Sequence, residues 1–173
     1  HRIGVPHLAD PERLLTSAAR IYGDEMDRLW GEMRPVPRDQ LVALDDEDSV
    51  PLGDREALAL DTPGHASHHL SYVVGDVCFT GDVGGVRIPG ETHVALPLAP
   101  PEIDLGAWRN SLARLRTAVD RHEEARLAPT HFGVYDDASA HIDRLARALD
   151  AAEAWTADTV PPHADDAAAL RGA

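Results

Sequence analysis

Three short segments of this chain each end one to four residues before a side chain that could bind a metal ion. The segments are 54–61, 77–80 and 125–130, and the residues that follow them are His65, Asp82 and His131. Segments of this length and composition predict β-strands. If the strands are neighbours in one sheet, their ends share an edge and hold the three side chains on rigid elements. This pattern predicts a sheet with a polar site along one edge.

Two further strands are expected from local signals. The segment 68–74 precedes Gly75-Asp76 and the strand 77–80, which predicts a tight β-hairpin. The apolar run "LVAL" at 41–44 also predicts a strand. The Gly- and Pro-rich segment 83–103 predicts a long loop, and long ordered loops are often functional.

Helices are expected before, between and after these strands. Asp10 and the proline that follows it begin one helix, or two short ones interrupted near Gly23. Asp104 begins a second helical segment, and Asp136 or Asp137 caps a last one. The order of elements predicts an α/β (α+β) fold in which helices cover a mixed sheet.

Length and composition predict one domain over residues 1–157 and a flexible tail over 158–173, where Ala, Asp and Pro dominate. The formal net charge of -14 argues against nucleic acid or an anionic membrane surface as a partner. The single cysteine, Cys78, excludes an internal disulfide, and no apolar run is long enough to span a membrane. We therefore expect a cytoplasmic protein.

Three motifs resemble the third, fourth and fifth motifs of the metallo-β-lactamase-fold hydrolases. They are "TPGHASHH" (62–69), "FTGD" (79–82) and "LAPTHFG" (127–133). The preceding residues resemble the middle of bacterial members related to the glyoxalase II type. The resemblance implies that His65 binds a first metal, that Asp82 bridges two metals and that His131 binds the second. It implies divalent ions, Zn²⁺ first, with Fe or Mn as alternatives, and a supporting role for His69.

The function that the resemblance implies is hydrolysis of an ester-like bond, of thioester or lactone type, in a small-molecule substrate. A metal-activated hydroxide would attack the carbonyl, and Asp82 would act in catalysis by holding the two ions at a fixed separation.

The main metal motif of the family, H-x-H-x-D-H, does not occur in this sequence. The only histidines before His65 are His1 and His7, and neither matches that motif. The chain thus resembles the C-terminal part of a four-layer αββα sandwich and provides two ligands for each ion. We expect this chain to be inactive by itself, and to need the missing N-terminal half as a further segment or another chain. An uncovered apolar sheet face would also allow a homo-oligomer.

Two other interpretations stay open at this point. The chain could be a non-catalytic metallo-β-lactamase-like module for binding or dimerisation, because the main metal motif is absent. A cupin-like site on His65, His68 and His69 is disfavoured, because His68 and His69 would point to opposite faces of a strand.

Overall fold

The computed structural model describes residues 1–98 and 102–159, and these form two compact units. The first unit is His1–Asp46, and the second begins at Glu47. The predicted tail lies outside the described residues from 160 onward, whereas residues 158 and 159 belong to the last helix. Among the described residues, no helix has the length and apolar character that crossing a membrane requires.

The first unit consists of short helices. They are α1 (Val5–Ala9), α2 (Glu12–Tyr22), η1 (Gly23–Glu25), α3 (Met26–Leu29) and η2 (Arg38–Gln40). The predicted break near Gly23 is confirmed, because α2 ends at Tyr22. The predicted strand at 41–44 is wrong: these residues have no regular structure, and Val42 is 72% exposed. An apolar run becomes a strand only where a partner strand pairs with it, and no strand among the described residues does so here.

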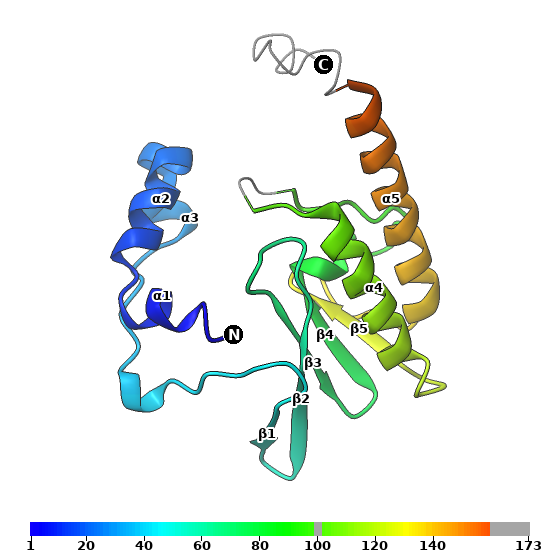
Figure 1. Ribbon diagram of the computed structural model, residues 1–173, viewed down its shortest axis with the longest axis horizontal. Coiled ribbons are helices and arrows are strands. Elements are labelled where there is room, and N and C mark those ends of the chain that lie inside the picture. The colour runs from blue at the N-terminus through cyan, green and yellow to red at the C-terminus, as the bar shows by residue number, and fades with distance from the viewer. Residues whose placement is uncertain (99–101, 160–173) are drawn as a thin grey trace. The chain divides into compact units, whose positions relative to one another are not determined.

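The second unit contains one mixed sheet whose strands lie in sequence order (Figure 1). The strands are β1 (Ser49–Leu52), β2 (Arg55–Asp61), β3 (Leu70–Val74), β4 (Val77–Gly81) and β5 (Arg126–Pro129). The first four pair in antiparallel fashion, and β5 runs parallel to β4. The predicted hairpin is confirmed, since Val74 pairs with Val77. The parallel pair requires a long crossover, which contains helix α4 (Leu105–Val119).

Strand β1 was not expected from the sequence. It follows an acidic run and contains Pro51, which cannot donate to a ladder of hydrogen bonds. β1 lies at the edge of the sheet, where one side of the strand has no neighbour among the described strands, so a proline is tolerated there.

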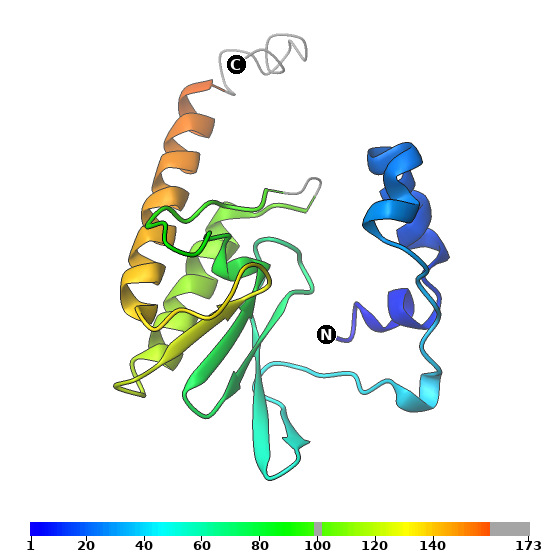
Figure 2. The ribbon, with the colours of Figure 1, turned by 180° about the vertical axis from the view of Figure 1, so that it is seen from behind.

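Helices α4 and α5 (Ala138–Thr159) pack beside each other on one face of the sheet (Figures 1 and 2). The core between them and the sheet includes Trp108, Leu115, Leu145 and Leu149, each 0% exposed, and Leu127 of β5. Cys78 belongs to this core, and burial raises the pKa of its thiol to about 12. The predicted fold class, a mixed sheet covered by helices, is confirmed.

The opposite face of the sheet carries Tyr72, Phe79 and Ala128, which are paired in register across β3, β4 and β5. Their neighbours Val73, Cys78 and Leu127 point to the helices, because successive side chains of a strand alternate between faces. Phe79 is 45% exposed.

An ion-pair network joins the loop after β4 to the start of α5. Asp137 accepts hydrogen bonds from Arg87 and Arg144, each at 2.6 Å. The Arg87 guanidinium also lies 4.6 Å from the centre of the Tyr135 ring. Burial by itself would raise the pKa of Asp137, but the hydrogen bonds from the two arginines lower it to about 2.

This network predicts a pH-dependent contribution to stability. The pKa of Asp137 is about 2 in the folded protein, and we take its ordinary value of 3.8 for the unfolded chain. The stabilisation is therefore complete above pH 3.8 and is lost as the pH falls towards 2. We expect Asp137→Asn to lower the free energy of unfolding by about 1 kcal/mol at neutral pH, after allowance for solvent screening. Urea unfolding of both proteins at several pH values measures this, and a difference that stays constant from pH 7 to 2 would contradict it.

Candidate metal centre

His65 lies in the loop between β2 and β3, and its ring is held in one orientation. Its Nδ1 lies 2.8 Å from the carbonyl oxygen of Pro97. A carbonyl can only accept, so Nδ1 carries a hydrogen, and in the neutral ring the lone pair is then on Nε2. Metal-binding histidines are commonly fixed in this way by a second hydrogen bond.

The position of His65 also depends on Gly64, which has a φ of 141°. A Cβ atom at this glycine would lie 2.5 Å from the Cα atom of Trp108. The loop therefore passes directly against the backbone of α4, and only glycine fits there.

Asp82 is the first residue of the 3₁₀ turn η3 (Asp82–Gly84), which follows β4. Gly81 has a φ of 58°, and a Cβ atom there would lie 2.4 Å from Nε2 of His69. The reversal at Gly81 turns the chain out of the sheet, so the carboxylate of Asp82 projects at the end of the strand.

His131 follows β5 by two residues and is more exposed than the other two candidates. Its side chain is 47% exposed, against 18% for His65 and 30% for Asp82. Phe132 has a φ of 69°, a conformation that is uncommon for an aromatic residue, and its ring centre lies 5.8 Å from that of His131.

The structure brings the three predicted side chains together around Asp82. Nε2 of His65 lies 3.7 Å from Oδ2 of Asp82, and Nε2 of His131 lies 3.4 Å from Oδ1. Each carboxylate oxygen therefore faces a different imidazole. A carboxylate in this arrangement can place one oxygen on each of two ions.

The donor set is chemically suitable for a divalent ion but small. Imidazole nitrogen and carboxylate oxygen are the ligands that Zn²⁺ takes besides thiolate. Within residues 1–98 and 102–159, however, no group of three or more His, Cys, Asp or Glu side chains has the arrangement to hold an ion. A catalytic zinc ordinarily has three protein ligands. These residues therefore fit the ions as a partial set, with two ligands for each.

His69 is connected by buried hydroxyl groups to β3, to β4 and to Thr62, the residue that follows β2. The hydroxyl of Ser71 donates to the carbonyl oxygen of Thr80 at 3.2 Å, and Ser71 and Thr62 are 2.8 Å apart. Oγ1 of Thr62 also lies 2.9 Å from Nδ1 of His69 and 3.5 Å from the carbonyl oxygen of Leu60. Nε2 of His69 lies against Gly81.

His69 is neutral at physiological pH. Burial lowers its pKa to about 4, although the Asp82 carboxylate has the opposite effect. A neutral ring beside Asp82 adds no positive charge to a site for cations, and the supporting role of His69 stays a prediction. His68 points elsewhere, because its Nδ1 lies 3.9 Å from Glu102.

Two buried side chains near Asp82 were not anticipated from the sequence as parts of this site. Trp108 of α4 donates from Nε1 to the carbonyl oxygen of Val83, and Nε2 of His141 in α5 donates to that of Gly84, both at 2.8 Å. Their signal in the sequence is weak, since both lie on the apolar stripes of their helices. The polar atom of a buried Trp or His ordinarily has a hydrogen-bond partner, but the sequence does not say which.

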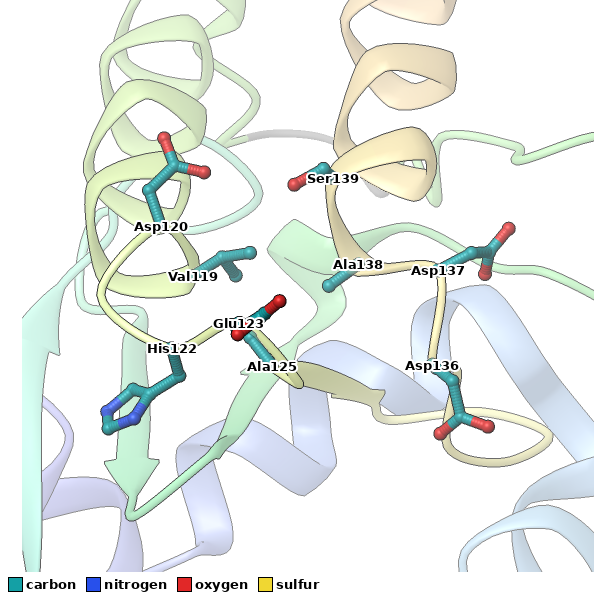
Figure 3. Close-up of a pocket in the computed structure, with 9 residues that line it drawn as sticks. All are labelled: Val119, Asp120, His122, Glu123, Ala125, Asp136, Asp137, Ala138 and Ser139. Atoms are coloured by element: carbon teal, nitrogen blue, oxygen red, sulfur yellow. The ribbon is translucent and has the colours of Figure 1, made fainter.

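A separate cavity of about 390 Å³ lies between the end of α4 and the start of α5 (Figure 3). Several carboxylates and one histidine line it, among them Asp120, His122, Glu123 and Asp136. Figure 3 shows that these side chains point in different directions and do not converge on one point. None of the three predicted ligands lines this cavity.

The fold and the site together define a class of protein, in which a mixed sheet presents histidine and aspartate at the ends of its strands. The chain belongs to the metallo-beta-lactamase superfamily, whose family model matches residues 2–131. The family resemblance noted in the sequence is thus confirmed.

Individual relatives agree with this assignment. The chain is 33% identical over 103 residues to the metallo-beta-lactamase fold-containing protein ST1585 of Sulfurisphaera tokodaii, a match that covers 60% of this chain and 38% of that protein. The crystal structure of ST1585 from Sulfolobus tokodaii has a TM-score of 0.67 at 26% identity and covers 83% of this chain and 54% of that chain.

Two more distant structures share the fold. The metallo-beta-lactamase family protein TTHA1429 from Thermus thermophilus has a TM-score of 0.56 at 22% identity, with 90% of this chain and 52% of that chain covered. FIM-1 from Pseudomonas aeruginosa, in its mono-zinc form, has a TM-score of 0.50 at 18% identity, with 79% and 60% covered. The chain spans about half the length of these solved relatives, and the sequence match to ST1585 covers 38% of that protein.

Proposed function

We propose that this chain is part of a metal-dependent hydrolase that acts on an ester-like bond, of thioester or lactone type, in a small molecule. The observation that carries the proposal is the position of Asp82, whose two carboxylate oxygens each face a different histidine. Membership of the metallo-beta-lactamase superfamily supports it, because hydrolysis is common in this superfamily.

In this proposal His65 and Asp82 hold one divalent ion, and Asp82 and His131 hold the other. Zn²⁺ is the first choice, because FIM-1, which shares the fold, has a zinc form, and because the donors are imidazole and carboxylate; Fe and Mn are alternatives. When bound, such ions supply Lewis acidity and lower the pKa of water towards neutrality. The carbonyl of Pro97 keeps Nε2 of His65 free to bind, and the neutral ring of His69 leaves the negative charge of Asp82 uncompensated.

The remaining ligands are proposed to come from a further segment of the protein or from another chain. The sheet face that carries Tyr72 and Phe79 supports this, since an apolar sheet face of this kind is ordinarily packed against another layer. Without that layer, the same face is a candidate surface for a homo-oligomer. A cytoplasmic location, and the absence of nucleic acid and membrane partners, stay predictions.

The experiment compares two samples: the chain as printed, and the same chain extended by the sequence encoded upstream of it. Each is purified, incubated with Zn²⁺, Fe²⁺ or Mn²⁺, and analysed for bound metal, for mass by light scattering, and for hydrolysis of thioester and lactone substrates. We expect the extended protein to bind up to two ions and to hydrolyse at least one substrate in a chelator-sensitive manner. The printed chain should bind metal weakly and self-associate.

The non-catalytic module stays a second candidate, because the described residues contain no set of three metal ligands. It would be favoured if the extended protein also lacked bound metal and hydrolysed none of the substrates.

A further inference from the structure

Two buried side chains donate hydrogen bonds to the main chain of η3, the turn that carries Asp82. Trp108 Nε1 donates to the carbonyl oxygen of Val83, and His141 Nε2 donates to the carbonyl oxygen of Gly84, each at 2.8 Å. Both side chains are 0% exposed, and so is Val83 itself. The two residues that follow Asp82 are thus fixed through their main chain, whereas the Asp82 side chain remains partly exposed.

The two donors come from different elements. Trp108 lies in α4, 25 residues after Val83, and His141 lies in α5, 57 residues after Gly84. The core that α4 and α5 form on the sheet therefore determines where η3 lies. Because the bonds are made to carbonyl groups, they hold the turn without using the carboxylate.

The state of the His141 ring is unusual for a core position. Its Nε2 must carry the hydrogen that the Gly84 carbonyl accepts, so Nδ1 is an acceptor in the neutral ring. That Nδ1 is buried and has no hydrogen-bond partner within residues 1–98 and 102–159. A buried polar atom without a partner destabilises a fold, and an apolar side chain would avoid this cost. Packing alone therefore does not explain a histidine here, whereas its bond to Gly84 does.

We propose that His141, with Trp108, is a positioning residue that aims the Asp82 carboxylate between His65 and His131 by holding the carbonyls of the next two residues. This inference rests on the proposed function, because it assigns a purpose to the position of a metal ligand. A bridging carboxylate must place both oxygens within a few tenths of an ångström of their ideal distances, so small movements of the turn weaken binding.

The test uses His141→Leu, which removes the donor at similar volume, and His141→Gln, whose amide can donate to Gly84. Trp108→Phe removes the second donor but keeps an aromatic ring. It tests the same proposal if His141→Leu does not fold. The control is Leu149→Ala, which creates a cavity in the same helix and the same core but removes no bond to η3. All are made in the protein extended by its upstream sequence.

Two measurements are made on each variant. The first is Zn²⁺ affinity, measured by competition with a chromophoric chelator. We expect His141→Leu and Trp108→Phe to weaken it by about 10- to 100-fold, as the loss of groups that support metal ligands does. We expect His141→Gln to restore most of the affinity, and Leu149→Ala to lower the melting temperature without changing affinity.

The second measurement is hydrogen–deuterium exchange of the metal-free protein over the peptide that contains residues 82–85. This peptide should exchange faster in His141→Leu and Trp108→Phe than in wild type. In Leu149→Ala, its exchange should increase no more than that of the other core peptides. Unchanged exchange in the first two variants overturns the inference, as does an affinity within about twofold of wild type. If the wild type itself binds no Zn²⁺, the proposed function fails, and the exchange result still decides whether the two donors hold the turn.

Discussion

Asp82→Ala in the protein extended by its upstream sequence should lose bound metal and hydrolytic activity together. Asp82 is the only one of the three candidates that faces both others, since its oxygens lie 3.7 Å from His65 and 3.4 Å from His131. Its removal takes one ligand from each proposed ion and leaves a single described ligand for each. We therefore expect the affinity for metal to fall by at least about 100-fold, and the activity to fall at least as far.

The matched control is Asp76→Ala. Asp76 precedes β4 and Asp82 follows it, so the two aspartates lie at opposite ends of one strand. Asp76 accepts a hydrogen bond from Arg126 at 2.8 Å, at the end of the strand away from the histidines of the site. Its loss should change metal content and activity little. Metal content is measured by plasma emission spectrometry, and an Asp82→Ala protein with wild-type metal content would exclude the bridging role.

Gly64→Ala should destabilise the fold more than a substitution at an ordinary surface glycine. The new methyl group would lie 2.5 Å from both Cα and Cβ of Trp108, and these atoms belong to a helix that cannot give way easily. The φ of 141° adds a conformational cost, because residues with a Cβ atom rarely adopt it. Together these effects should lower the free energy of unfolding by about 3 kcal/mol or more.

Gly90→Ala separates the two contributions. Gly90 has a φ of 87°, but a Cβ atom there would have no neighbour within 4 Å among the described residues. Its substitution should therefore cost only the conformational part, about 1 kcal/mol. Urea unfolding of both variants gives the comparison. Equal losses for Gly64→Ala and Gly90→Ala would show that the close approach to Trp108 does not limit the side chain at position 64.

Local signals were sufficient to anticipate much of this fold. The hairpin at Gly75-Asp76 depends on two residues and the strands beside them, and the cap at Asp104 depends on one turn of helix, where its carboxylate accepts from Ala107 at 2.8 Å. The strand at 41–44 and β1 show where such signals fail. Whether a short segment is a strand depends on a partner elsewhere in the chain, so Ser49–Leu52 pairs with β2 despite its proline, and 41–44 joins no strand that the structure describes.

For the candidate site, the sequence by itself determined which residues stand at the ends of strands: His65, Asp82 and His131. Their types and order also carry the family assignment, because motifs are local in the chain. Only the tertiary structure decided that each oxygen of Asp82 faces a different histidine, and that Trp108 and His141 hold the turn beneath it. These contacts join residues from 17 to 57 positions apart. The packing of α4 and α5 on the sheet brings these residues together in space, and no local pattern of residues encodes that packing.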